Sequence, residues 1–432
     1  MKERDLLLVC VIIALFVRIF LLFAIGDTDY LSGISLLHAQ FGHNLLAGTR
    51  FAGDVVFSSR PQGYGLLLAL TTLLTQHESY IYLRLFQSLV DSLSCVIIFY
   101  LGKLLFDRRV GLVSAFLYAS FMPSALLSII ALPESFSSFL LLTLMWLFLK
   151  GIKENSNKLI YLSSLFVSIE CYLKGQFLTL PFALLFIMLI YRQHKVRDNI
   201  VIFLKYYFLV YLLLSPWIIT VYTHTGQIMP FLRTQYWQGV WEGFGEDETN
   251  PFGAVWSDDK TLQQIKSEGY DVVPCSLGYD AILRDKSIDA IKKEPLWVLR
   301  LFAIRLFTNP TIGLYRAANL TPINNENEII FLIYGLFNNF SILIVIATSM
   351  LALVFIVANI KAKNYKDIFI LYIIPCFIFL PLILVHLEAR YIIPVLCLLI
   401  IPAAAMIVKI IDKLKHIIGH WQYSRMPPRM ET

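Results

Sequence analysis

Charged side chains inside hydrophobic segments are the residues of this chain whose types suggest chemistry. A charge at the centre of a lipid bilayer costs at least about 2.5–3.5 kcal/mol, so each one needs a partner or a function. Most of them lie near the same end of their segments: Arg18, Asp27, Asp29, Arg84, Glu134, Lys174, His386, Glu388 and Arg390. Cations at that depth suit a phosphate or pyrophosphate, and carboxylates beside them suit a proton acceptor. We therefore expect a lipid-phosphate substrate at one face of a membrane.

Each of these residues, taken alone, also has a structural explanation. Arg18 and Arg84 could be anchors that extend toward the membrane surface. Glu134 could be a carboxylate favoured by the dipole at the start of a helix. Two further carboxylates, Asp91 and Glu170, lie deeper, where they could be buried partners of an arginine or a lysine. The functional interpretation depends on the convergence of the whole set.

The composition requires lipid as the solvent for this protein. Hydrophobic residues make up 58% of the 432 residues and charged residues 15%, and the mean hydropathy is +0.69. Soluble domains are about 45–50% apolar and about 25% charged. These values exclude a soluble enzyme, a disordered chain and a secreted disulfide scaffold. The six cysteines show no CxxC pattern or paired spacing, so we expect neither a disulfide nor a zinc site. We also expect no cofactor and no nucleic-acid partner, while a divalent metal at paired acids stays open as an alternative.

Apolar segments of about 20 residues predict transmembrane helices. The sequence predicts an all-α polytopic membrane protein of about ten spans, with a long first external loop and a larger one after the seventh helix. The candidate spans are 6–25, 82–102, 110–128, 133–150, 159–176, 177–192, 200–221, 329–358, 367–386 and 391–412. Lysine and arginine gather in one set of connections, which places both termini in the cytoplasm. The charged set described above then lies at the external face.

The predicted spans also define the organisation of the chain. We expect an N-terminal transmembrane unit over 1–221 with a first external loop at 26–80, an external loop domain over 222–327, further transmembrane helices over 328–412 and a basic tail over 413–432. In the second loop, 279–293 is predicted to be a helix that ends before Pro295. The apolar stretches 64–74 and 296–307 are too short to span, so we expect helices at the membrane surface or re-entering it.

Several short motifs follow one another in a defined order. Arg18 precedes Asp27-Thr28-Asp29-Tyr30, and Arg60-Pro61-Gln62-Gly63-Tyr64 follows. Further along the chain come Pro133-Glu134, Lys174-Gly175 and Glu388-Ala389-Arg390-Tyr391-Ile392-Ile393-Pro394. In this order the motifs resemble the polytopic GT-C glycosyltransferases that use polyprenyl-phosphate sugars. These are the dolichyl-phosphate-mannose-protein mannosyltransferase family and its aminoarabinose transferase kin. The resemblance covers most of residues 10–310 and returns near 386–405.

The resemblance implies a function and a role for each matching residue. The donor would be a polyprenyl-phosphate sugar, and the acceptor a hydroxyl on a glycolipid, a glycan or a protein outside the membrane. Asp27 would be the base, with Asp29 as its nearest rival, and Glu134 would orient the acceptor or the sugar. Lys174 and Arg390 would hold the departing phosphate. The secondary phosphate-binding candidates are Arg60, Arg84 and Arg18, and the substrate-binding candidates are Tyr64, His386, Glu388 and Tyr391.

The same resemblance implies cell envelope biogenesis in a bacterial inner membrane, with the active site on the external side. Three other classes of protein stay open from the sequence. A transporter or flippase of lipid-linked glycans would also carry charge inside the membrane, but it predicts a site at the midplane. An envelope polysaccharide polymerase or ligase would use a similar donor. A structural subunit of an envelope complex needs no paired carboxylates.

Overall fold

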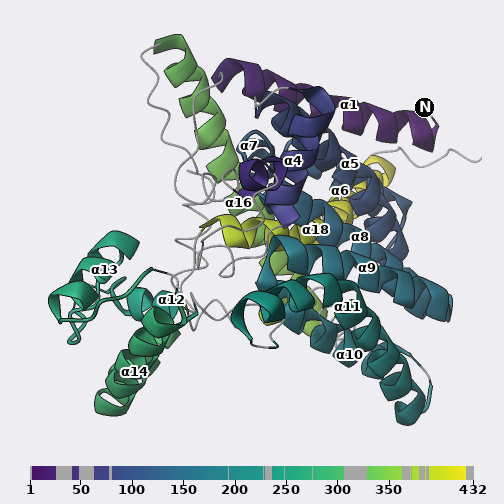
Figure 1. Cartoon of the computed structure of the whole chain (residues 1–432). Helices are drawn as coiled ribbons and strands as arrows, with labels where there is room; N and C mark the ends of the chain where they lie inside the picture. The colour runs from purple at the N-terminus through teal and green to yellow at the C-terminus, as the bar shows by residue number, and fades with distance from the viewer. Residues whose placement is uncertain are drawn as a thin grey trace, which may run out of the picture.

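The computed structural model shows a bundle of helices (Figure 1). It describes residues 2–25, 41–47, 63–76, 80–192, 194–226, 228, 236–247, 249–274, 276–305, 328–361, 370, 372–378, 385 and 389–424. Every regular element in these ranges is an α-helix or a short 3-10 helix. The predicted all-α polytopic fold is therefore confirmed.

Six of the described helices are long and apolar enough to cross a membrane. They are α1 (Glu3–Ile25), α5 (Ile81–Leu105), α8 (Glu134–Lys153), α11 (Val196–Thr225), α16 (Glu328–Lys361) and α18 (Ala389–Ser424). The spans predicted over 159–176 and 177–192 are shorter than expected. The helix α9 (Asn157–Leu173) ends before Lys174, and the 3-10 helix η1 (Gly175–Thr179) precedes α10 (Leu180–Tyr191). Most of the predicted span 367–386 lies outside the described residues. The total of about ten therefore stays a prediction.

The span predicted over 110–128 is broken into two helices. α6 (Arg108–Ala119) and α7 (Met122–Ser128) meet at an angle of 52°, and together they make one further candidate span. Pro123 lies in the first turn of α7. There its missing N–H does no harm, whereas a continuous helix would bring its ring against the preceding turn. The break turns the first residues of α7 into the bundle.

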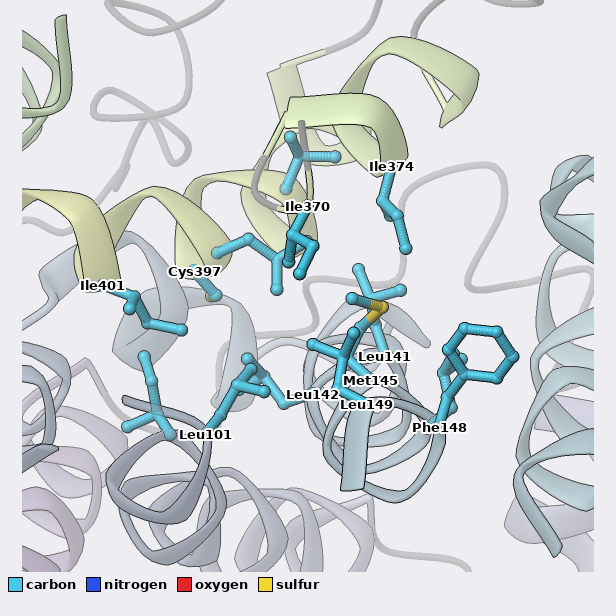
Figure 2. Close-up of a cluster of buried hydrophobic side chains, with 14 of the residues drawn as sticks. Leu101, Leu141, Leu142, Met145, Phe148, Leu149, Ile370, Ile374, Cys397 and Ile401 are labelled. Atoms are coloured by element: carbon cyan, nitrogen blue, oxygen red, sulfur yellow. The ribbon is translucent and has the colours of Figure 1, made fainter. Parts of the chain in front are cut away.

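The core lies where the central helix α8 meets its neighbours. In α8, 83% of the most apolar 18-residue stretch is buried inside the bundle, whereas in α16 only 28% of the corresponding stretch is buried. Figure 2 shows Leu141, Leu142 and Met145 of α8 on the side that faces Leu101 of α5, Cys397 of α18 and the pair Ile370 and Ile374. α8 is therefore shielded by protein, and the outer helices present leucine and phenylalanine to the lipid.

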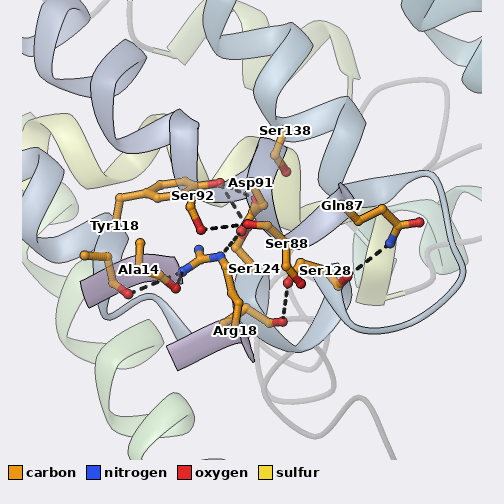
Figure 3. Close-up of polar contacts among 12 residues, drawn as sticks. Ala14, Arg18, Gln87, Ser88, Asp91, Ser92, Tyr118, Ser124, Ser128 and Ser138 are labelled. Atoms are coloured by element: carbon orange, nitrogen blue, oxygen red, sulfur yellow. Dashed lines mark hydrogen bonds and ion pairs between the residues drawn. The ribbon is translucent and has the colours of Figure 1, made fainter. Parts of the chain in front are cut away.

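A buried ion pair ties α1 to the rest of the bundle (Figure 3). Nε of Arg18 lies 2.6 Å from Oδ2 of Asp91, and both side chains are fully buried. Tyr118 and Ser124 donate to Oδ1 of Asp91 at 2.7 and 2.8 Å. Nη1 of Arg18 donates to the carbonyl of Ala14 at 2.9 Å. One carboxylate therefore connects α1, α5, α6 and α7, which makes Asp91 the buried partner that one reading of the sequence expected.

The described part of the predicted loop over 222–327 forms a small helical unit beside the bundle (Figure 1). It contains α12 (Tyr236–Phe244), α13 (Asp258–Ser267), α14 (Leu277–Lys293) and a helix described over 295–305. Trp241, Phe244 and Leu283 lie at the centre of its own apolar core. The predicted end of α14 is confirmed, because Pro295 begins the next helix.

This loop unit touches the turn before α18 at a glycine. A Cβ added to Gly243 would lie 2.1 Å from the carbonyl oxygen of Val385 and 2.6 Å from Nη2 of Arg305. Val385 also packs against the apolar core of the loop unit. Oε2 of Glu246 pairs with Nε of the buried Arg305 at 3.0 Å. The absence of a side chain at Gly243 therefore allows the loop unit to dock on the connection to α18.

We expect Gly243→Ala to loosen this docking, because the backbone carbonyl of Val385 cannot move away as a side chain could. Hydrogen exchange of the 236–247 and 295–305 amides should become faster in the variant. Gly278→Ala is the matched control, since the nearest atom to its added Cβ is 3.9 Å away. Equal exchange in the wild type and in Gly243→Ala would contradict the role of this contact.

A carboxyl group inside the loop unit makes its stability depend on pH. Glu242 is 5% exposed and accepts a hydrogen bond from Nε2 of Gln238 at 2.9 Å. Burial and the neighbouring Asp258 carboxylate raise the pKa of Glu242 from its usual 4.5 to about 8. Between these two pH values the folded unit binds a proton that the unfolded chain releases. Its stability therefore falls as pH rises from about 4.5 to about 8.

We expect the amides of α12 and α13 to exchange faster at pH 8.5 than at pH 6.0, after correction for intrinsic exchange rates. Glu242→Gln should remove this difference, because an amide keeps the hydrogen bond and does not ionise. A difference of the same size in the wild type and in Glu242→Gln would show that another group is responsible.

Candidate active site

An ion pair at the start of α8 is the centre of the candidate site. Oε1 of Glu134 lies 2.9 Å from Nζ of Lys174, and the two side chains are 2% and 8% exposed. Glu134 is the first residue of α8, where the positive end of the helix dipole favours a carboxylate. Lys174 directly follows α9 and is extended, with φ −147°. The two ends lie side by side because α8 and α9 pack against each other along their length.

The C-terminal helix contributes an aromatic ring to the same place. Nζ of Lys174 lies 4.8 Å from the ring centroid of Tyr391 in the first turn of α18. This distance is typical of an attraction between a cation and the face of an aromatic ring. Residues more than 200 positions apart in the sequence therefore meet at one ammonium group.

A second polar contact lies one turn deeper between the same two helices. Oγ of Ser137 donates to Oε2 of Glu170 at 2.6 Å, and Glu170 is fully buried. Glu170 lies in the last turn of α9, and Lys174 follows that helix in extended backbone. The sequence suggested Glu170 only as a buried partner of an arginine or a lysine, and the structure gives it a hydrogen bond from a serine of α8.

Polar side chains of α5 hold the segment that leads into Glu134. Nε of Arg84 donates to the carbonyl of Ile129 at 2.5 Å. Nε2 of Gln87 donates to the carbonyls of Ser128 at 3.2 Å and of Ile130 at 2.7 Å. Ser128 is the last residue of α7, and Ile129 and Ile130 follow in the turn that leads to Glu134. Figure 3 shows Gln87 beside Ser128. Gln87 therefore fixes the turn that places Glu134. The sequence signal for this role is the position of Gln87 on α5, one turn after Arg84.

The short helix α4 (Gly63–Thr75) brings part of the connection between α1 and α5 to the same site. Its Tyr64 is buried and donates its hydroxyl hydrogen bond to Oε1 of Gln87. The charges of Glu134 and Arg84 both act on this hydroxyl group. A Cβ added to Gly63 would lie 2.7 Å from the carbonyl oxygen of Tyr172, two residues before Lys174. The close approach at Gly63 therefore sets α4 against the end of α9.

The structure thus brings together four of the residues that the sequence singled out: Tyr64, Glu134, Lys174 and Tyr391, with Arg84 close by. Arg18 lies elsewhere, in its ion pair with Asp91. Arg390 belongs to α18 directly before Tyr391, and only its backbone is described. Asp27, Asp29, Arg60, His386 and Glu388 lie outside the described residues.

The arrangement can neutralise a charged group away from water. A lysine held by a carboxylate in a protected site can exchange that partner for a phosphate, because both are anionic acceptors. No group of three or more His, Cys, Asp or Glu side chains that could hold a metal ion occurs in the described ranges. The ionisable groups at this site are Lys174, Arg84 and the carboxyl groups of Glu134 and Glu170. Tyr64 and Tyr391 lie beside them.

Comparison with known proteins gives one family match over part of the chain and a likeness to solved structures. Residues 59–220 match the family model described as dolichyl-phosphate-mannose-protein mannosyltransferase. The crystal structure of the apo oligosaccharyltransferase from Archaeoglobus fulgidus is 14% identical over 98% of this chain, with a TM-score of 0.53. The complex of that protein with Zn and sulfate is 12% identical over 94% of this chain, with a TM-score of 0.52. No curated protein sequence matches the chain.

These comparisons confirm the resemblance that the motifs predicted. The family match includes Tyr64, Arg84, Glu134 and Lys174, which are the residues that meet at the site. At this identity the structural likeness shows a shared fold. The chain spans about half the length of the oligosaccharyltransferase, 52% of the apo chain and 49% of the chain in the complex.

We expect the Glu134–Lys174 pair to show strong energetic coupling. Glu134→Gln or Lys174→Met alone should cost about 3–5 kcal/mol, because each leaves a charge buried without its partner. The double variant should cost less than the sum of the two single changes. The free energy of unfolding in mixed detergent and SDS measures all three. Arg109→Met is the control, since the exposed Arg109–Asp412 pair should change stability little. Additive costs would contradict the coupling.

Proposed function

We propose that this protein is an integral membrane glycosyltransferase. It transfers a sugar from a polyprenyl-phosphate donor to a hydroxyl acceptor on the external side of the membrane. The observation that carries the proposal is the buried Lys174 held between Glu134 and Tyr391, within a segment that matches the mannosyltransferase family. A transporter of lipid-linked glycans would place its charged site at the midplane, whereas here Glu134 begins α8 and Lys174 follows the end of α9.

Lys174 and Arg390 bind the phosphate of the donor in this proposal. Lys174 gives up Glu134 for the phosphate, so Glu134 becomes available to orient the sugar or the acceptor. Arg60 in the first external loop is a further cation for the donor. Arg84 and Arg18 were secondary candidates for the same role. Their contacts with the Ile129 carbonyl and with Asp91 support assigning them to positioning instead.

The transfer is a displacement at the sugar carbon. The acceptor oxygen forms a bond to that carbon while the bond from the carbon to the phosphate oxygen breaks. The hydroxyl proton passes to Asp27 or, as the rival, to Asp29. The polyprenyl phosphate leaves with the bonding electrons, and Lys174 and Arg390 stabilise its charge, since relief of developing charge is often the largest catalytic term. Tyr64, Tyr391, His386 and Glu388 contact the sugar or border the lipid chain.

The proposal also assigns a location. The charged site faces outside, both termini are cytoplasmic, and the membrane is a bacterial inner membrane. The loop unit of α12–α14 then lies on the side of the site and contributes to binding the acceptor. The transfer needs no metal ion in this proposal, because cationic side chains already hold the phosphate. Activity that is lost on chelation and restored by a divalent metal would overturn this point.

Two variants test the site, and they have different expected effects. Lys174→Ala should weaken binding of undecaprenyl phosphate by about 10- to 100-fold, since a hydrogen bond to a charged group contributes about 1.5–3 kcal/mol. Asp27→Asn should keep that affinity and lower transfer by about 100-fold or more, because it removes the base. Binding is measured by native mass spectrometry of the purified protein, and transfer with a labelled polyprenyl-phosphate sugar.

Lys413→Ala is the matched control, because Lys413 is an exposed lysine of α18. Its affinity should equal that of the wild type. Unchanged donor affinity in Lys174→Ala would reject the phosphate site. Wild-type turnover by Asp27→Asn would reject the base and leave the phosphate site standing.

A further inference from the structure

Arg192 is a buried arginine at the opposite end of the bundle from the candidate active site. It follows α10 directly and lies beside the start of α9, whereas Lys174 lies at the far end of α9. The 17 residues of α9 separate the two positions by about 25 Å. We call this side the basic end, because Lys103, Arg108 and Lys153 lie there with the start of α1.

The guanidinium of Arg192 is held in place by one contact. Its Nη2 donates to Oδ1 of Asn157, the first residue of α9, at 2.6 Å. The side chain is 5% exposed. Nε and Nη1 are also buried, and neither has a hydrogen-bond partner among the residues that the structure describes. A buried charged donor without an acceptor is costly, so these two nitrogens point to a partner outside the chain.

The electrostatics around Arg192 favour an anion over a water molecule as that partner. Lys158, Lys195 and Arg197 lie in the same segments and are exposed. Two helices, α9 and α11, begin beside Arg192, and the start of a helix carries partial positive charge. Lys195 precedes α11 and gives its first turn no side-chain cap. The carboxylate of Asp198 acts on Arg192 from a distance, without forming an ion pair with it in the described structure. The positive charge there is thus only partly compensated.

We propose that Arg192 and Asn157 form a binding site for the phosphate group of an anionic membrane lipid, separate from the active site. The phosphate accepts from Nε and Nη1 of Arg192, which Asn157 holds in position through Nη2. The first turn of α11 and the exposed Lys158 and Arg197 add attraction from the rim. A lipid is the source that fits the position, because the basic end lies where helices of membrane-spanning length begin and end. The bound lipid stabilises the junction of α9, α10 and α11.

The test uses the purified full-length protein in a neutral detergent, with phosphatidylglycerol as the probe. Native mass spectrometry measures its apparent affinity, and the rise in unfolding temperature measures stabilisation. Arg192→Gln should weaken binding at least tenfold and lose most of the stabilisation. Arg197→Gln is the matched control: it removes the same charge from an exposed residue nearby and should change affinity less than threefold. Asn157→Ala keeps Arg192 and its charge and should also weaken binding. This variant replaces Arg192→Gln as the test if Arg192→Gln does not fold.

Three results would overturn the proposal. Equal losses in Arg192→Gln and Arg197→Gln would mean that diffuse charge, and not a built site, attracts the lipid. Equal stabilisation by phosphatidylcholine would exclude recognition of an anionic headgroup. Stabilisation by millimolar inorganic phosphate that competes with phosphatidylglycerol, and that exceeds its effect, would assign the site to a free phosphate. None of these measurements uses glycosyl transfer, so the result is independent of the proposed function.

Discussion

A charge inside a membrane bundle has to be neutralised by the protein itself, and two buried ion pairs do this here. The ion pair of Arg18 and Asp91 joins α1 to α5. The carboxylate of Asp91 also accepts hydrogen bonds from Tyr118 and Ser124, which links the pair to α6 and α7. Glu134 and Lys174 join the start of α8 to the end of α9. Removing one partner of such a pair leaves an uncompensated charge, which costs more than the pair contributes. The helices are therefore fixed most firmly where their charges meet.

The two pairs differ in what surrounds them, and this difference supports separate roles. An arginine, a tyrosine and a serine all donate to the carboxylate of Asp91, so that carboxylate has its partners inside the bundle. Lys174 faces a carboxylate and a tyrosine ring beside the connection to α18, and α4 packs near it through Gly63. A lysine in that setting can change partners when an anionic group arrives. The same physical requirement thus holds the bundle together at Asp91 and, in the proposed function, makes Lys174 available to a phosphate.

The sequence predicted the helical class and the convergence of Glu134, Lys174 and Tyr391. Six of its ten predicted spans correspond to helices of spanning length among the described residues, because hydrophobic length follows from local composition. It could not pair Arg18 with Asp91, since the two residues are 73 positions apart and either could have had another partner. The bend at Pro123 was missed because the apolar run continues through it. Gln87 and Ser137 were missed as supporting groups, because uncharged polar residues are common in membrane helices. The predicted residues Asp27, Asp29, Arg60, His386 and Glu388 lie beyond the described ranges.

We propose that this protein transfers a sugar from a lipid phosphate to an envelope molecule. Mass spectrometry of envelope glycolipids and glycoproteins from cells with and without the protein tests it most directly. The account predicts that one species loses a hexose- or pentose-sized mass in the deletion strain, and that the wild-type protein restores it while Lys174→Ala does not. Identical glycolipid and glycoprotein profiles in the two strains, under conditions where the protein is present in the membrane, would contradict it.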